Sequence, residues 1–392
     1  MTNPVLRIGT RASALARIQA QWVAQRLKAH HPEVEVELVP VTTAGDRNRS
    51  RPLYALDTAG AFVKELEEAL RAGRIDLAVH SAKDVPTRLP EGLELAAFPQ
   101  REDPADALVL PRPRSEPGDP GSPSGAGPAV PGAAPAGLEA ALAALPAGAR
   151  VGTSSLRRQA WLRARRPDLV VEPARGNLDT RLRRLDEGAW DALLLAAAGL
   201  RRLGLAHRIT ATVGPADLLP APGQGALAVE IRAGDEAVRR RVAVLNQPEV
   251  ALAVRAERAF LAELGGTCRV PLGALARIEG DRIVIRGLVA GPAGHPWLEE
   301  EVAGPAADPE GAGRHLAARL LERGAAEVRA AAGAAAGVPG RPTAAAGTPG
   351  RAAPAAGRAG AAGLAPAGGR REGAGPGGGG DDHDGGATGR AR

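Results

Sequence analysis

The chain is poor in the residues on which several kinds of protein chemistry depend. Its 392 residues include one cysteine, Cys268, which excludes an internal disulfide and a metal site made only of cysteines. Aromatic residues make up 2% of the chain, so the stacking platforms that bind single-stranded nucleic acid are scarce. No apolar run approaches the roughly 18 residues of a membrane-spanning helix, and no signal-peptide pattern opens the chain. We therefore expect a cytoplasmic protein that holds no metal and contacts no membrane.

Positive charge is in excess. The formal net charge is +6 and the isoelectric point is about 10.4, a balance that suggests an anionic partner. Residues 332–392 consist largely of Ala, Gly, Pro and Arg, which predicts a disordered tail that raises the isoelectric point, and residues 111–137 predict a disordered insertion. The charge of the whole chain therefore overstates the case for nucleic acid, which we do not expect as a partner.

Lysine is rare, and one of the three lysines marks a candidate site. Residues 75–79 are apolar and predict a short buried strand, after which polar residues run from His80 to Asp84 and include Lys83. In an open α/β sheet, ligands bind beyond the carboxyl ends of the strands. A cation beside a carboxylate at such a position can hold or move a proton. A solvated ion pair in a loop would explain this stretch equally well.

Strands and helices alternate along the chain. Apolar patterns predict strands at 5–8, 34–41, 75–79, 93–98, 107–110, 150–152, 169–173 and 190–197. Helical spacing predicts helices at 14–30, 62–72, 138–145, 156–166 and 178–187. This order is typical of mainly parallel α/β sheets. Residues 42–59 show no clear period, as expected for a lid or a disordered loop.

Two turns share one pattern, in which a strand is followed by Gly-Thr, then Ser, then a helix. Ser13 belongs to the first turn, and Thr153 and Ser155 belong to the second. Backbone N–H groups at a helix N-terminus favour anions, although Ser13 can equally cap its helix. Arg157 and Arg158 fall in the first turn of the second helix, where cations oppose the helix dipole and an anionic partner would stabilise them.

Arginines gather after the predicted strands. We expect an anion-binding cleft lined by Arg11, Arg157, Arg158, Arg175, Arg181 and Arg202. Residues 199–204, which include the last of these arginines, are expected to form a loop. For any single arginine, an ordinary charged surface is the better explanation, whereas the shared position at strand ends favours a cleft for the set.

The C-terminal part predicts a small α+β domain. A helix is expected at 248–264, an antiparallel meander at 270–278, 282–290 and 297–302, and further helix at 306–331. Gly265 can end the first helix in a left-handed conformation, which places Cys268 on a loop.

Seven motifs occur in one order and spacing: RIGTRAS at 7–13, FVKELE at 62–67, AVHS with KDVP at 78–86, VGTSSLRR at 151–158, RGN with TRL at 175–182, PGQG at 222–225 and GGTC at 265–268. Together they resemble the porphobilinogen deaminase family, also called hydroxymethylbilane synthase, over roughly residues 5–328. The resemblance implies an α/β fold with two domains similar to periplasmic binding proteins and a small α+β C-terminal domain. We expect the first domain at 1–102 and 220–243, the second at 103–219 and the third at 244–331.

The resemblance also implies the chemistry. It implies a dipyrromethane cofactor joined by a thioether to Cys268, and the condensation of four porphobilinogen molecules into hydroxymethylbilane with loss of ammonia. Asp84 matches the catalytic aspartate. Cofactor and substrate contacts would come from Arg11, Ser13, Ser81, Lys83, Thr153, Ser155, Arg157, Arg158, Arg175, Arg181 and Arg202. Ala59 stands where many relatives have a lysine. The alternative is a two-lobed anion-binding protein without catalysis, and a monomer is expected in either case.

Overall fold

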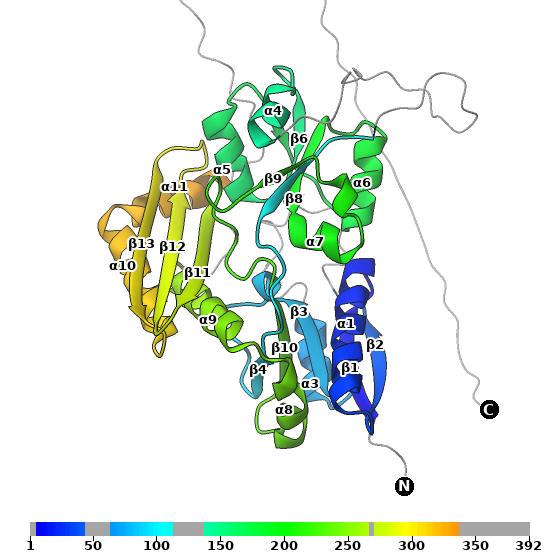
Figure 1. Cartoon of the computed structure of the whole chain (residues 1–392). Coiled ribbons are helices and arrows are strands. Elements are labelled where there is room, and N and C mark those ends of the chain that lie inside the picture. Colours follow the sequence, from blue (N-terminus) through cyan, green and yellow to red (C-terminus); the bar gives the residue numbers. More distant parts are fainter. Residues whose placement is uncertain (1–4, 44–62, 113–136, 266–269, 337–392) are drawn as a thin grey trace, which may run out of the picture. The chain divides into compact units, whose positions relative to one another are not determined.

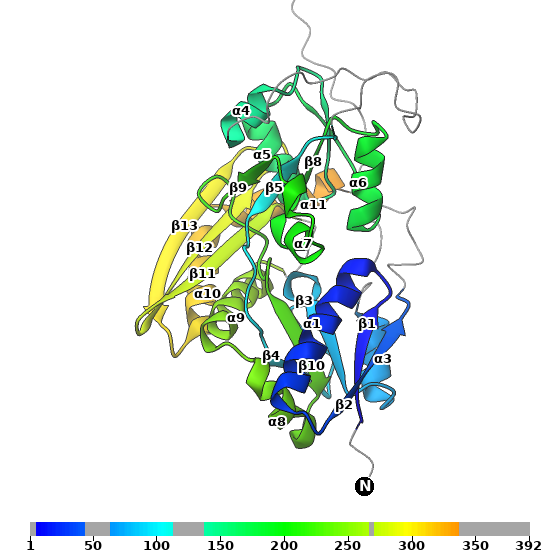
Figure 2. The same ribbon diagram turned by 45° about the vertical axis from the view of Figure 1, so that its right-hand side comes forward.

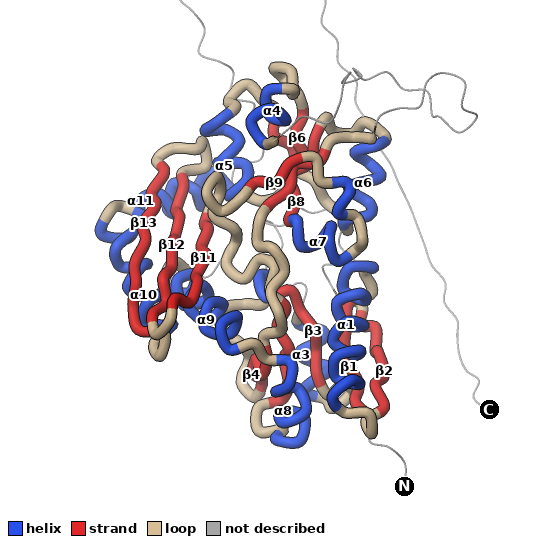
Figure 3. Tube along the Cα trace, in the orientation of Figure 1, coloured by secondary structure: helices blue, strands red, loops and turns tan. Residues whose placement is uncertain are grey.

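The computed structural model describes residues 5–43, 63–112, 137–265 and 270–336 (Figure 1). These residues form two five-stranded sheets and one three-stranded sheet, each covered by helices (Figures 1 and 3). Residues 44–59 of the segment 42–59 that was predicted to be a lid or a disordered loop, most of the insertion, Cys268 and residues 337–392 lie outside the described residues.

The first sheet has the strand order β2-β1-β3-β10-β4. Its strands are β1 (Val5–Arg11), β2 (Glu35–Val41), β3 (Leu77–Ser81), β4 (Leu93–Ala97) and β10 (Leu227–Arg232). β1 runs parallel to β2 and β3, whereas β10 runs antiparallel to β3 and β4. The helices α1 (Ala14–His30) and α8 (Glu236–Val242) share a core with one face, and α3 (Lys64–Arg71) packs on the other.

The second sheet repeats this plan with the order β7-β6-β8-β5-β9. Its strands are β5 (Asp106–Val109), β6 (Arg150–Gly152), β7 (Val170–Glu172), β8 (Ala192–Ala196) and β9 (Ala211–Val213). Here β5 is the antiparallel strand. Its helices are α4 (Leu138–Ala143) and α5 (Leu156–Arg165) on one face, and α6 (Leu178–Asp186) and α7 (Ala197–Arg202) on the other.

The third sheet is the expected antiparallel meander. It consists of β11 (Leu272–Glu279), β12 (Arg282–Ala290) and β13 (Trp297–Pro305). Three helices share its core: α9 (Pro248–Glu263), α10 (Pro309–Glu322) and α11 (Ala325–Ala336) (Figure 2). The α/β class with an additional α+β part is therefore confirmed.

The two Gly-Thr turns need glycine because neighbouring side chains press on the backbone. A Cβ at Gly152 would come within 2.6 Å of Leu193 and 2.8 Å of Trp190, and one at Gly9 would collide with Ile75. In both sheets a large apolar side chain fills the space in front of the glycine. The repeated sequence pattern thus corresponds to repeated packing.

Some sequence expectations were wrong. Residues 199–202 belong to helix α7 rather than a loop, because Leu200 is buried against the second sheet. Each five-stranded sheet contains one antiparallel strand that the alternation of elements did not predict. The expected tail begins too early, since α11 continues to Ala336 and Ala332 is buried.

Candidate active site

The carboxyl end of the first sheet presents the first group of predicted side chains. Arg11 ends β1, and Ser13 caps α1 by accepting a hydrogen bond from the N–H of Ala16 at 3.3 Å. Ser81 ends β3, and its Oγ receives a 3.3 Å hydrogen bond from Nε2 of the buried Gln19. The capping role of Ser13 is therefore confirmed, and it leaves the other N-terminal N–H groups of α1 available to an anion.

Lys83 and Asp84 follow β3 in the single 3₁₀ turn Ala82–Asp84. Burial lowers the pKa of Lys83 to about 8, although the carboxylate of Asp84 opposes this shift and the guanidinium of Arg158 adds to it. Asp84 itself is exposed. The pair therefore combines an open carboxylate with an amine that can lose its proton near neutral pH.

His80 does not belong to this exposed group. It lies within β3, 5% exposed, and its Nε2 is 2.9 Å from Oε2 of the fully buried Glu230 on β10. The polar run after the buried strand therefore begins one residue later than the sequence pattern suggested.

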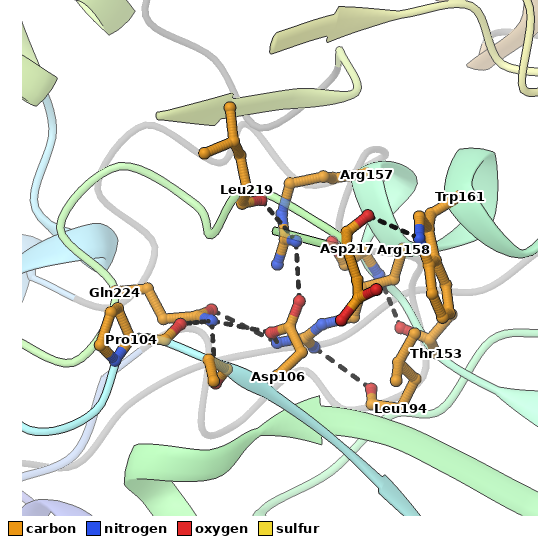
Figure 4. A network of polar contacts seen from close by, with 12 residues as sticks. Pro104, Asp106, Thr153, Arg157, Arg158, Trp161, Leu194, Asp217, Leu219 and Gln224 are labelled. Carbon is orange, nitrogen blue, oxygen red and sulfur yellow. Dashed lines mark hydrogen bonds and ion pairs between the residues drawn. The ribbon is translucent and has the colours of Figure 1, made fainter. Parts of the chain in front are cut away.

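The N-terminus of α5 carries the second group. Thr153 is buried, and its Oγ1 accepts a 3.3 Å hydrogen bond from the N–H of Ser155. Arg157 and Arg158 are 3% and 7% exposed. Each places a guanidinium nitrogen 2.7 Å from the carboxylate of Asp106 on β5 (Figure 4). The anion beside these two arginines is thus a carboxylate of the same chain.

Backbone carbonyls complete this network. Arg157 donates to the carbonyl of Leu219 at 2.8 Å, and Arg158 donates to that of Leu194 at 3.2 Å. The side chain of Gln224 donates to Asp106 at 2.7 Å and accepts from Arg158 at 3.3 Å (Figure 4). Two guanidinium groups against one carboxylate leave one positive charge in excess, although burial lowers the pKa of Arg157.

Arg175 and Arg181 lack such partners. Nη1 of Arg175 and Nε of Arg181 are buried and have no hydrogen-bond partner among the described residues. Burial lowers the pKa of both side chains, that of Arg181 to about 10. Because buried polar groups are normally paired, these nitrogens are available to a hydrogen-bond acceptor. Arg202 differs, since its Nη2 donates to the carbonyl of Gly225 at 2.6 Å.

Charges from the two five-stranded sheets meet at this site. The carboxylate of Asp84 acts on Arg181, and the charges of Asp106, Arg157 and Arg158 act on Lys83. The fold therefore brings together residues that were predicted at strand ends and that lie far apart in the sequence. The prediction missed Gln19, Asp106 and Gln224. The PGQG motif marked Gln224, whereas Asp106 lies in a short buried strand and carries no sequence signal.

Cys268 lies outside the described residues. Gly265, which follows α9, has a φ of 88°, the left-handed conformation expected of a glycine that ends a helix. Among the described residues there is no cluster of His, Cys, Asp or Glu that could hold a metal ion, and no helix long and apolar enough to cross a membrane.

The fold and the site define an α/β protein with two five-stranded sheets, in which guanidinium groups gather after the strands and the carboxylate of Asp84 is exposed. Solved structures resembled by the chain include a double mutant of the VFT2 domain of BvgS from Bordetella pertussis, at 18% identity and a TM-score of 0.34 over 62% of this chain and 86% of that one.

Family models identify the group more closely. Residues 6–240 match the model described as "Porphobilinogen deaminase, dipyromethane cofactor binding domain", and residues 251–322 match that of the "Porphobilinogen deaminase, C-terminal domain". The chain is 49% identical to a porphobilinogen deaminase of Roseiflexus castenholzii, covering 81% of this chain and 96% of the relative. It is 48% identical to that of Syntrophotalea carbinolica, covering 84% and 97%. The chain belongs to the porphobilinogen deaminase family.

Proposed function

We propose that this chain catalyses the head-to-tail condensation of four porphobilinogen molecules, releasing ammonia at each addition and yielding hydroxymethylbilane for porphyrin synthesis. Family membership supports the activity and the status of the chain as an enzyme. The observation that carries the proposal is the exposed carboxylate of Asp84 within electrostatic reach of Arg181, whose buried Nε has no hydrogen-bond partner among the described residues.

The arginines suit the charge of the product. Each pyrrole of the substrate carries an acetate and a propionate, so the growing chain accumulates carboxylates in one place. Like charges that are partly removed from water repel each other strongly unless they are paired. Arg175 and Arg181 offer unpaired nitrogens, and Arg157 and Arg158 add an excess positive charge. We assign binding roles to these four residues together with Arg11, Ser13, Ser81, Lys83, Thr153, Ser155 and Arg202.

The same groups fit a dipyrromethane cofactor. Its four carboxylates match the orphaned nitrogens of Arg175 and Arg181 and the ammonium of Lys83. We propose a thioether to Cys268 as its attachment. When bound, the cofactor supplies the pyrrole to which the first substrate is joined. The tether would hold one of the two reactants of each addition in place, so that only the incoming porphobilinogen has to bind and be positioned.

Asp84 is the proposed catalytic residue. Loss of ammonia from porphobilinogen leaves a cationic azafulvene, which a nearby carboxylate stabilises. The exposed oxygens of Asp84 can also accept hydrogen bonds from pyrrole N–H groups and take up the proton released when the new bond forms. The neighbouring Lys83, in its protonated form, can bind a carboxylate of the substrate.

Product formation from porphobilinogen tests the activity directly. The purified chain is expected to release ammonia and hydroxymethylbilane, and its intact mass should exceed the sequence mass by two linked pyrroles. Cys268→Ser should lack this added mass. Asp84→Asn should keep the added mass, whereas its kcat should fall about 100-fold or more, because general acid–base and electrostatic contributions are of that size.

Asp281→Asn is the matched control, since Asp281 is an exposed carboxylate in the turn between β11 and β12. It should retain full activity. An unmodified thiol and no hydroxymethylbilane after incubation with porphobilinogen would leave only an anion-binding protein. Undiminished turnover in Asp84→Asn would overturn the catalytic role of Asp84. Cytoplasmic location and a monomeric state remain predictions.

A further inference from the structure

The backbone that follows Asp84 has three carbonyls in succession that no helix or strand uses. Val85, Pro86 and Thr87 form a bend after the 3₁₀ turn, and no backbone N–H within the described chain donates to their carbonyl oxygens. Polar backbone groups in a partly buried segment need partners. This segment follows Asp84 directly, at the end of the 3₁₀ turn.

Arg258 on α9 supplies these partners. Its Nη1 donates to the carbonyl of Val85 at 3.1 Å, and its Nη2 donates to those of Pro86 at 2.6 Å and Thr87 at 3.4 Å. Burial lowers the pKa of Arg258, while the carboxylate of Glu230 opposes that shift. Three backbone carbonyls therefore hold the guanidinium in place, and the buried carboxylate of Glu230 favours its charge.

Apolar packing fixes the same two segments against each other. Val254, which lies one helical turn before Arg258, is fully buried in a cluster with Ala82 and Val85. Residues four apart project from the same face of a helix. One face of α9 thus packs beneath the Asp84 segment and also clamps its carbonyls.

α9 is also the helix that leads toward Cys268. It runs without interruption from Pro248 to Glu263, and Gly265 then turns the chain. An uninterrupted helix is stiff over this length. The contact of Arg258 therefore relates the position of the Asp84 segment to the start of the segment that contains Cys268.

We propose that Arg258 is a positioning residue, which fixes the backbone that carries Asp84 and thereby aims the Asp84 carboxylate. The proposal rests on the catalytic role proposed above for Asp84. An arginine suits this task because its planar group presents several donors in a fixed geometry. Lysine would keep the charge and could satisfy some of the carbonyls, but without that geometry.

The test compares Arg258→Gln and Arg258→Lys with Arg255→Gln. Arg255 lies on the same helix, is exposed, and pairs with Glu310 at 2.6 Å, which makes it a matched control. The wild-type chain is assayed first, because a failure to form product there would overturn the proposed function and not the role of Arg258. Hydrogen exchange of residues 82–88 is measured in all variants, independently of activity.

Arg258→Gln is expected to keep the added mass on the chain and a KM within about threefold of wild type, while kcat falls by about 10- to 100-fold, the cost of a misplaced catalytic group. Exchange at residues 82–88 should rise at least about tenfold. Arg258→Lys should recover part of both effects, and Arg255→Gln should show neither. A kcat within twofold of wild type, a change confined to KM, or unchanged exchange at residues 82–88 would each overturn the proposal. If Arg258→Gln does not fold, the kcat, the KM and the exchange at residues 82–88 of Arg258→Lys are compared with those of wild type, and the same outcomes support or overturn the proposal.

Discussion

The buried arginines of the site fall into two groups, those that pair with the carboxylate of Asp106 and those that do not. Arg157 and Arg158 are tied to Asp106, so much of their charge is already compensated. Each of the four side chains keeps a buried nitrogen without a hydrogen-bond partner, but Arg175 and Arg181 also have no ion pair with a carboxylate among the described residues. The sequence shows the same residue type, twice over, after two strands. Only the folded chain distinguishes the arginines that pair with a carboxylate of the chain from those that do not.

Lys83 gives a prediction about pH. Because burial lowers its pKa to about 8, the neutral amine should appear at lower pH than in an exposed lysine. In the cofactor-free protein, pulse acetylation followed by peptide mass mapping should reach half its maximum at Lys83 near pH 8. Bound carboxylates favour the ammonium form, so the midpoint should rise once the cofactor is in place.

Lys28 provides an internal reference for this measurement, since it is exposed on α1. A midpoint close to the ordinary value of 10.5 in the cofactor-free protein would contradict the effect of burial. A midpoint that falls on loading would contradict carboxylate binding at Lys83.

Among the elements, helix α5 has two cations in its first turn, which is electrostatically unfavourable, and a carboxylate on strand β5 compensates them. Cations in the first turn of a helix oppose its dipole, and α5 places Arg157 and Arg158 there. Asp106 on β5 lies against both guanidinium groups, although β5 is separated from α5 by two other elements along the chain. A strand that the sequence marked only as apolar thus determines whether this helix end is stable.

Asp106→Asn tests this dependence. The substitution leaves two buried guanidinium groups without a counter-charge, and loss of one partner from a buried ionic pair costs about 3–5 kcal/mol of the free energy of unfolding. Urea unfolding of the cofactor-free protein should show this loss. The same substitution in an Arg158→Met background should cost less, because fewer charges remain uncompensated; equal costs in the two backgrounds would refute the coupling.

For the whole molecule, helix α11 is the last element that the structure describes. Ala325 and Val328 are buried in the core of the third sheet, and Ala332 is 2% exposed. Helix α11 belongs to the compact unit that contains the described residues, and the last of them is Ala336. The composition of the tail suggested an earlier limit, because an alanine-rich helix and an alanine-rich disordered segment have similar compositions.

Two truncations locate this limit. A chain that ends at Gly340 should keep its activity within about twofold and its stability unchanged. A chain that ends at Gly324 loses the buried side chains of α11 and should lose about 2–4 kcal/mol of the free energy of unfolding. Urea unfolding and product formation are measured on both. A tenfold loss of activity on removal of residues 341–392 would contradict the assignment of the catalytic unit.

The sequence by itself determined the class of fold, most of the strands and helices and the strand ends at which charged residues gather, because local periodicity and glycine positions report on neighbouring residues. It also indicated the family, through motifs that recur in a fixed order. The tertiary structure alone decided that Asp106 pairs with two arginines, that His80 is buried against Glu230, and that Arg258 holds the segment after Asp84. Each of these contacts joins residues from different elements, and no local pattern records which distant side chain will fill a given space.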